Sequence, residues 1–274
     1  MNKSFKILAK PYIVWLGLLA ILPMLVMLVL SFAFSEGLSF EEGYFTFDQF
    51  SMLLERSTLV AFGNSLFYAG ITTVICLVLG YFVAYTVFKS KFKNKFLILT
   101  IFILPMWSNL LLRTEALFNL MQSNNLLTSI FGNGLGIDII GTPPAVIIGL
   151  VFTYLPFMIL PIYTALEKID YSLEEAALDL GLTPLEKFWK VIFPLSLKGV
   201  ATGSILVFLP SMSGFAIPEI LGAGNILLIG NVIEQAFRNM DYNFGSLLAI
   251  VILLFILGAL LTVSKVDKEG ETLL

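Results

Sequence analysis

Long stretches of apolar residues without charge alternate with short charged segments along the chain. A helix that crosses the hydrocarbon of a bilayer needs roughly 20 such residues, because each residue advances the helix by about 1.5 Å. The pattern therefore predicts an all-α membrane protein in which six transmembrane helices form one domain over residues 1–274. The expected spans are residues 11–35, 61–88, 96–112, 144–166, 199–218 and 244–264.

A seventh uncharged run, Ala116–Ile137, is long enough to cross a bilayer but too polar to do so. Its asparagine and glutamine side chains would lie in hydrocarbon without a hydrogen-bonding partner, which is costly. We therefore expect an outer loop at residues Arg113–Asp138.

The positions of the lysines predict the orientation of the spans. Lysine and arginine collect in cytoplasmic loops, within about 15 to 20 residues of the membrane. With six spans and the N-terminus inside, every lysine of the chain lies on the inner side, and the three arginines lie outside or at the outer edge. The sequence thus predicts that both termini are cytoplasmic and that residues 167–198 form a long cytoplasmic loop.

The composition agrees with a membrane protein and excludes other classes. Of the 274 residues, 58% are hydrophobic and only 13% are charged, whereas soluble domains have about 25% charged residues. A net charge of −3 without a basic patch excludes a nucleic-acid-binding protein. Because the chain has no histidine and one cysteine, we expect no metal site. Cys76 lies in an apolar stretch and is expected to be a small buried residue.

The cytoplasmic loop is predicted to contain two short capped helices. Ser172 and Glu175 have the spacing of a capping box, in which the serine is the N-cap and the glutamate is residue N3. Gly181 follows as the left-handed residue that ends a helix. Thr183 begins a second capping box, and the second helix is expected to end near Pro194.

Each predicted loop helix has an apolar face with the spacing i, i+3, i+4 and i+7. Such a face either rests on the membrane or docks into a groove on a partner protein, and the small residues of the first face favour docking. The two faces are Leu173, Ala176, Ala177 and Leu180, and Leu185, Phe188, Trp189 and Ile192.

The same loop resembles the EAA loop of ABC-importer permeases, whose pattern is EAA-x3-G-x9-I-x-L-P. The resemblance rests on Glu175-Ala176-Ala177, Gly181 and Val191-Ile192-Phe193-Pro194, with valine and phenylalanine replacing isoleucine and leucine of the pattern. It implies a type I ABC-importer permease fold. It also implies that Glu175, Ala176, Ala177, Gly181 and Pro194 take part in docking the loop into a cleft of a cytoplasmic ATPase.

Most of the chain is also similar to the first permease subunits of spermidine/putrescine importers. The stretches that carry this resemblance are Leu104–Asn109, Pro144–Leu150, Leu155–Pro161, Leu166–Asp170 and Leu227–Ile233. The resemblance implies a multi-pass protein of the prokaryotic cytoplasmic membrane, surrounded by membrane lipid. It further implies a second homologous permease, two copies of an ATPase and an external polyamine-binding protein as partners.

No G-x-x-x-x-G-K-[ST] sequence, the phosphate-binding loop of ATPases, occurs in the chain. We therefore expect no catalytic activity and no cofactor bound by this chain. ATP and Mg²⁺ are expected to be bound by the partner ATPase.

Polar and aromatic residues beside helix-breaking prolines are the candidates for a substrate pathway. Trp107 and Asn109 lie in the third span, and Met212, Phe215 and Glu219 lie in the fifth. A tryptophan ring can bind a cation, and a carboxylate can bind an ammonium group. The alternatives are an interfacial position for Trp107 and, for Glu219, a structural role at the outer edge, such as pairing with Arg113.

The sequence is also compatible with other transported solutes and leaves other functions to be weighed. The same kind of permease could carry an amino acid, thiamine or a metal–ligand complex. An ion-coupled secondary transporter would require paired ionisable residues near the bilayer centre and internal repeats, which we do not find. A purely structural membrane subunit would not need the EAA-like loop. The outer segment Ile226–Met240 is expected to form a small helix that contacts the binding protein.

Overall fold

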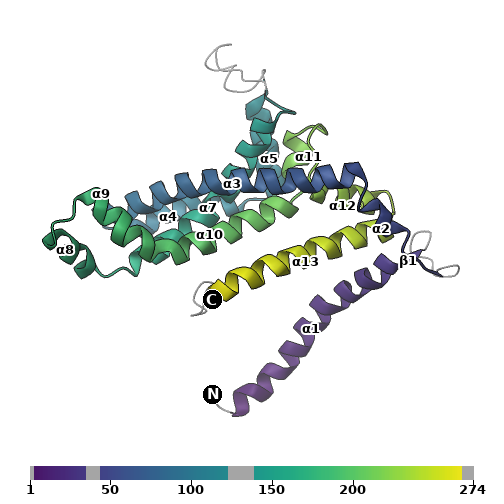
Figure 1. The fold of residues 1–274 in the computed structure, drawn as a ribbon, viewed down its shortest axis with the longest axis horizontal. Coiled ribbons are helices and arrows are strands. Elements are labelled where there is room, and N and C mark those ends of the chain that lie inside the picture. Colours follow the sequence, from purple (N-terminus) through teal and green to yellow (C-terminus); the bar gives the residue numbers. More distant parts are fainter. Residues whose placement is uncertain (1–2, 35–43, 123–138, 267–274) are drawn as a thin grey trace. The chain divides into compact units, whose positions relative to one another are not determined.

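A computed structural model describes residues 3–34, 44–122 and 139–266 (Figure 1). The described chain is almost entirely helical, with one pair of two-residue antiparallel strands. The elements are α1 (Lys3–Phe32), β1 (Ala33–Phe34), β2 (Tyr44–Phe45), α2 (Gln49–Met52), α3 (Arg56–Lys89), α4 (Lys95–Ile103), η1 (Leu104–Trp107), α5 (Leu110–Met121), α7 (Pro143–Glu167), α8 (Tyr171–Asp179), α9 (Pro184–Lys187), η3 (Phe188–Ile192), α10 (Phe193–Ser213), α11 (Ala216–Leu221), α12 (Ile229–Arg238) and α13 (Tyr242–Val266).

Among the described residues, five helices are long and apolar enough to cross a membrane, and one bent pair of helices also passes this test. Counting the bent pair as one interrupted span gives the six predicted crossings. The five long helices are Lys10–Phe32, Arg56–Lys89, Pro143–Glu167, Pro184–Ser213 and Tyr242–Leu261.

The third span is interrupted and extends beyond the predicted range of residues 96–112. Its two halves, Lys95–Trp107 and Leu110–Met121, meet at an angle of 95°. Ser108 is extended, and the side chain of Asn109 then caps a new helix. The extended Ser108 therefore ends the first half of the span, and Asn109, as the N-cap, begins the second half. Helix α5 also corrects the expected outer loop, whose first residues up to Met121 are helical, while residues 123–138 lie outside the described part of the chain.

The fifth span differs from the prediction at both ends. The second loop helix does not end near Pro194, because α9, the π-helical turn η3 and α10 follow one another without a break. Pro194 lies in the first turn of α10, directly after the wider π-helical turn η3. Proline has no N–H to donate to the preceding turn, and an irregular turn at this point is consistent with that loss. At the other end α10 stops at Ser213, and α11 begins only at Ala216.

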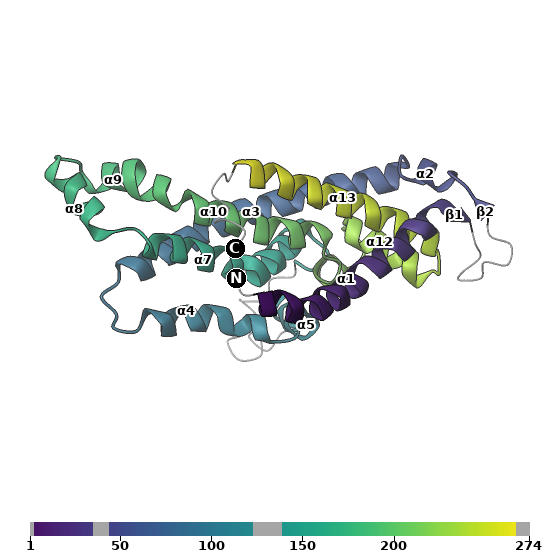
Figure 2. The same ribbon diagram turned by 90° about the horizontal axis from the view of Figure 1, so that it is seen from below.

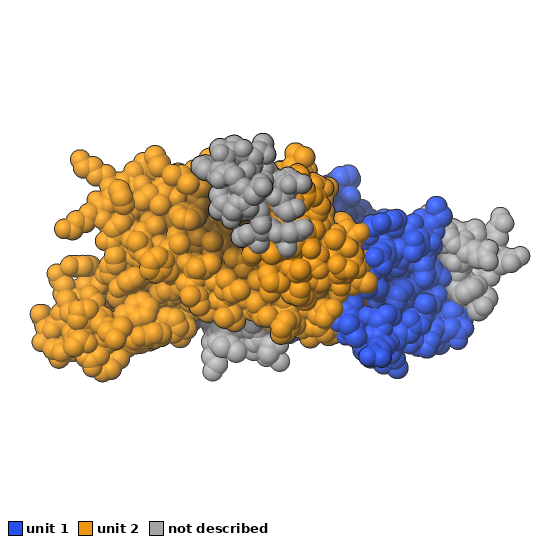
Figure 3. All heavy atoms as spheres, turned by 90° about the horizontal axis from the view of Figure 1, so that it is seen from above, with its two compact units in different colours: residues 1–61, 232–258 blue, residues 62–231, 259–274 orange. Residues whose placement is uncertain are grey.

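The described chain divides into two compact units, residues 1–61 with 232–258 and residues 62–231 with 259–274 (Figure 3). The single domain expected from the sequence stays a prediction. In the first unit α1 is exposed along most of its length. The unit also contains an aromatic cluster in which the ring centroids of Phe32, Phe47 and Phe50 lie 5.5 to 5.9 Å apart.

The second unit is built on α3, α7 and α10, which run side by side (Figure 1). Glycines allow this close packing: a Cβ at Gly199 would lie 2.5 Å from the Pro161 carbonyl oxygen, and one at Gly203 would lie 2.8 Å from Met158 Sδ. Cys76 of α3 is fully buried against α7, as predicted. Helices α8 and α9 lie at one end of this unit (Figure 2), and α5 and α11 lie beside each other away from that end (Figure 1).

The predicted orientation can be tested with single cysteines at exposed positions in a Cys76→Ala background. In intact cells, Glu55→Cys is expected to react with a membrane-impermeant thiol reagent, because it follows the first span on the predicted outer side. Lys93→Cys, in the loop after the second span, should react only after the cells are permeabilised. Labelling of Lys93→Cys in intact cells would contradict the orientation.

Candidate functional site

Helix α8 begins at Tyr171, so its N-cap lies two residues before Ser172, the predicted N-cap. The N-cap is Asp170, whose Oδ1 accepts a hydrogen bond from Ser172 N at 2.9 Å. This bond lowers the pKa of the Asp170 carboxyl below its usual range. The prediction that Ser172 caps the helix is therefore wrong. Aspartate and serine are both good N-caps, and the pattern alone did not distinguish them.

Gly181 ends α8 in the left-handed conformation that the sequence predicted, with φ +78°. Leu182 N donates to the Ala177 carbonyl at 3.1 Å, and Gly181 N donates to the Leu178 carbonyl at 2.9 Å. These two bonds form a Schellman motif, which satisfies the carbonyl groups at the end of the helix. No atom lies within 4 Å of the position that a Cβ on Gly181 would occupy. Gly181 is therefore required by the backbone conformation and not by crowding.

The capping box of the second loop helix is present as predicted. Thr183 N donates to Glu186 Oε2 at 3.0 Å, and Glu186 N donates to Thr183 Oγ1 at 3.3 Å. The bonds from Thr183, together with Lys190 Nζ at 3.1 Å from Glu186 Oε1, lower the pKa of Glu186 to about 2. The direction of α9 is thus fixed at its first turn.

The two predicted apolar faces are only partly covered by the rest of the chain. Ala177 and Ile192 are buried, while Leu180 is 83% exposed and Trp189 is 56% exposed. We call the exposed apolar side chains of these faces the coupling surface, which comprises Leu173, Ala176, Leu180, Leu185 and Trp189.

The residues matched by the EAA pattern differ in their exposure. Glu175, Gly181 and Pro194 are all exposed, whereas Ala177 packs inward. An apolar area at the tip of a membrane protein, left uncovered by its own chain, is typical of a docking site for another protein.

A buried carboxylate that the sequence did not single out ties this loop to the second span. Glu174 of α8 is only 2% exposed and forms ion pairs with Lys89 at the end of α3 and with Lys187 of α9. The distance from Lys187 Nζ to Glu174 Oε2 is 3.0 Å. Burial favours the neutral acid, but the two lysines outweigh it and lower the pKa of Glu174.

Aromatic side chains reinforce the same attachment. Phe188 packs edge-on against Tyr85 at 5.2 Å and against Tyr81 at 5.6 Å between ring centroids, so η3 is held on α3. The Tyr81 hydroxyl also forms a 2.8 Å hydrogen bond with the Ser196 hydroxyl of α10. The coupling surface is therefore carried on a framework that includes α3 and α10.

In the interrupted third span, the two candidate pathway residues have different roles. Trp107 is the last residue of η1 and is 89% exposed, so its ring is open to a ligand or to lipid. The Oδ1 of Asn109 accepts hydrogen bonds from Leu111 N at 2.8 Å and Leu112 N at 3.4 Å. Asn109 thus stabilises the break itself.

The break is further held by the carbonyl oxygen of Pro105. This oxygen accepts hydrogen bonds from Ser108 Oγ and from Arg113 Nη1, each at 2.7 Å. Arg113 therefore bonds to the backbone of η1. The same carbonyl oxygen also accepts the Ser108 N–H at 3.2 Å, so three donors converge on the end of the first half-helix.

The break in the fifth span lies against the start of α5. A small cavity of about 90 Å³ is lined there by Leu110, by Leu150 and Tyr154 of α7, and by residues 214–218. Phe215, one of the predicted pathway residues, lies on this lining and is 44% exposed. Met212, by contrast, is fully buried and lines no open surface. Two interrupted spans thus meet in one place.

Glu219 lies next to this junction and is bonded to a residue that the sequence did not single out. Asn231 Nδ2 donates to Glu219 Oε2 at 2.9 Å and to the Phe215 carbonyl at 3.0 Å. Asn231 is fully buried in the first turn of α12, the predicted outer helix. Glu219 is half-buried, and Asn231 orients its carboxylate. This bond gives Glu219 a structural role, one of the two alternatives stated for it above.

Comparison with known proteins assigns the chain to a transporter family. Residues 77–266 match the family "Binding-protein-dependent transport system inner membrane component". The spermidine/putrescine transport system permease protein PotB of Haemophilus influenzae is 38% identical over 254 residues, covering 91% of this chain and 89% of that protein. PotB of Escherichia coli is 39% identical over 255 residues, covering 91% and 92%.

Solved structures show the same fold at low sequence identity. A chain of a bacterial alginate ABC transporter superposes with a TM-score of 0.77 at 18% identity, covering 97% of this chain and 96% of that chain. A chain of the MetNI methionine ABC transporter gives a TM-score of 0.54 at 18% identity, covering 78% and 95%. The predicted fold of an ABC-importer permease is confirmed, and the cytoplasmic location of the termini stays a prediction. The chain is a multi-pass protein of the cytoplasmic membrane, and it belongs to the family of inner membrane components of binding-protein-dependent transport systems.

Proposed function

We propose that this chain is the permease subunit of an ATP-driven importer of polyamines, with spermidine and putrescine as its substrates. The observation that carries the proposal is the 38 to 39% identity over 91% of the chain with spermidine/putrescine permeases. The likeness covers both the coupling loop and the two interrupted spans. In this proposal the solute is received from an external polyamine-binding protein.

The coupling surface supports a role in energy transfer. Its exposed leucines and Trp189 form an apolar area that would fit a groove on a cytoplasmic ATPase. We propose that two ATPase copies bind ATP and Mg²⁺, one beneath this chain and one beneath a second homologous permease. This chain itself binds no cofactor and catalyses no reaction in the proposal. Glu174 and Phe188 would transmit the movement of the loop to α3, because they join the two directly.

The interrupted spans support a transient site for a cation. Discontinuous helices place polar backbone and side-chain groups within the membrane, where transporters bind their solutes. Trp107 offers a ring face to an ammonium group, and Glu219 offers a carboxylate. Two unit charges about 4 Å apart attract by roughly 4 kcal/mol at an effective dielectric of about 20, before desolvation is subtracted. Such a site is weak, as transport requires, because a tightly bound solute would not be released.

The test uses the assembled complex in proteoliposomes with the binding protein and radiolabelled spermidine. Trp107→Leu removes the ring face, and Glu219→Gln removes the charge while its amide oxygen can still accept from Asn231. Each variant is expected to slow uptake about tenfold, equivalent to about 1.4 kcal/mol, while the complex still hydrolyses ATP.

A matched control is Trp15→Leu, which removes another exposed tryptophan from a different span and should transport normally. If Trp107→Leu and Glu219→Gln both transport spermidine at the wild-type rate, these residues do not form the site. If the wild-type complex transports no polyamine, and a different solute co-purifies with the binding protein, the proposed substrate is wrong.

A further inference from the structure

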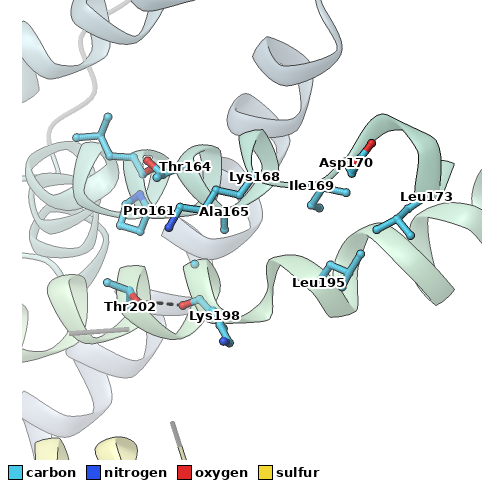
Figure 4. Close-up of a pocket in the computed structure, with 12 residues that line it drawn as sticks. Pro161, Thr164, Ala165, Lys168, Ile169, Asp170, Leu173, Leu195, Lys198 and Thr202 are labelled. Carbon is cyan, nitrogen blue, oxygen red and sulfur yellow. Dashed lines mark hydrogen bonds between the residues drawn. The ribbon is translucent and has the colours of Figure 1, made fainter. Parts of the chain in front are cut away.

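A cleft opens between the ends of α7 and α10 at the base of the coupling loop (Figure 4). Its volume is about 690 Å³, within the range of about 300 to 1,000 Å³ that is usual for sites of small molecules. Most of its lining is apolar and includes Leu160 and Pro161 of α7, Leu173 of α8 and Leu195 of α10. The cleft is separate from the junction of the interrupted spans and has no role in the proposed function.

The cleft is bounded where the two helices touch. Gly199 is buried against α7, and a Cβ in its place would lie 2.6 Å from Ala165 Cβ and 2.5 Å from the Pro161 carbonyl oxygen. The helices cannot approach further at this point, and they separate toward the loop. The cleft therefore belongs to the helix packing itself and does not depend on a flexible side chain.

Two lysines stand on the rims of this apolar cleft, Lys168 at the end of α7 and Lys198 on α10. Both are exposed, and Figure 4 shows Lys168 extending back along α7 on the side that faces α10. Asp170 is the one acidic residue of the lining, and its carboxylate points away from the cleft and accepts the Ser172 N–H (Figure 4). The Thr202 hydroxyl donates to the Lys198 carbonyl at 3.0 Å. The rim is thus cationic and the interior apolar.

We propose that this cleft binds an anionic phospholipid of the cytoplasmic leaflet, with its phosphate at Lys168 and Lys198 and an acyl chain along Leu160 and Pro161. An apolar groove between membrane helices with basic residues at the inner rim matches an amphiphile with one negative end. Lysine is suited to this position because its methylene stem lies on apolar surface while its ammonium group reaches the headgroup region. A soluble anion would leave the apolar walls uncovered.

The proposed lipid site touches the coupling loop directly, because Asp170 and Leu173 of its lining belong to the cap and first turn of α8. A bound lipid would fill the space beneath α8 and steady the position of that helix. The site would thus link the composition of the membrane to the coupling loop.

The test uses the complex of the permease with its partner subunits, reconstituted in nanodiscs of mixed phosphatidylglycerol and phosphatidylcholine. A trace of either lipid carries a photoactivatable acyl chain, and the labelled peptides are identified by mass spectrometry. We expect phosphatidylglycerol, and not phosphatidylcholine, to label the peptides that contain residues 160–173 and 195–202. Labelling is expected to fall about tenfold or more in Lys168→Ala/Lys198→Ala.

The matched control is Lys91→Ala/Lys93→Ala, which removes the same charge from exposed lysines of another inner loop and should label normally. Thr164→Trp is a second variant, which fills the cleft without changing a charge and should also abolish labelling. Equal labelling by the two lipids, or unchanged labelling in both cleft variants, would overturn the proposal. So would efficient cross-linking of Thr164→Cys, in a Cys76→Ala background, to the second permease, because a protein would then occupy the cleft.

Discussion

Replacing Gly181 with aspartate is expected to abolish ATP-driven uptake while the permease remains inserted and assembled. Gly181 has a φ of +78°, where a residue with a Cβ costs about 1 kcal/mol relative to glycine. This cost is too small to unfold a membrane domain. The aspartate also places a charge next to Leu180, on the coupling surface, and a desolvated charge without a partner is costly at an apolar interface. The measurements are spermidine uptake and ATP hydrolysis by the assembled complex.

Gly224 offers a matched control for this substitution. It has the same φ of +78°, and no atom lies within 4 Å of its Cβ position either, so Gly224→Asp adds the same strain and the same charge. It lies between α11 and α12, away from the loop. Gly224→Asp is expected to transport at close to the wild-type rate. Equal loss of uptake in the two variants would mean that backbone strain, and not the coupling surface, explains the effect.

The parts of the fold that depend on local sequence could be predicted. Uncharged apolar length predicted the spans, since a bilayer requires it whatever the neighbouring helices are. The turn at Gly181 and the capping box at Thr183 were also predictable, because each is stabilised by bonds between residues at most five apart. Helical spacing likewise predicted the apolar faces of the loop helices, but not which of their residues are buried.

Features that depend on distant parts of the chain could not be predicted. Lys89 and Glu174 are separated by 85 residues, and neither belongs to a local motif that indicates the other. The pairing of Asn231 with Glu219 likewise needs α12 to pack on the break after α10.

The interruption of the third span had a local signal in the sequence Ser108-Asn109, because both residues favour helix ends. The polarity of Asn109 predicts a pathway residue, whereas its Oδ1 caps α5.

Removing the charge of Glu174 is expected to separate ATP hydrolysis from transport. In Glu174→Gln the ammonium groups of Lys89 and Lys187 remain close together without their shared counter-ion. Loss of one partner of a buried ion pair costs about 3 to 5 kcal/mol, and the lower end applies here because Lys89 is 34% exposed and screened by water. The loop would then detach from α3, so uptake should fall at least tenfold while ATP hydrolysis continues. Limited proteolysis within residues 167–198 should increase in parallel.

Two further variants distinguish this ion-pair role from a general loss of stability. Asp179→Asn removes the same charge from an exposed position on the same helix and should behave as wild type. Glu174→Gln/Lys187→Met removes the surplus positive charge as well and should recover part of the lost uptake, because an apolar pair can replace a buried ion pair. If the double variant is no better than Glu174→Gln, charge balance is not what holds the loop.

The pH dependence provides an independent measurement of the same ion pairs. The folded-state pKa of Glu174 lies below its usual value, so its stabilising contribution is present above the unfolded-state pKa and is lost as the pH falls through the folded-state pKa. The wild-type loop should therefore stay resistant to proteolysis at neutral pH and become sensitive only in acid. In Glu174→Gln this transition should disappear, because the amide does not titrate. A Glu174→Gln variant that retains the wild-type transition would assign it to another carboxylate of the loop.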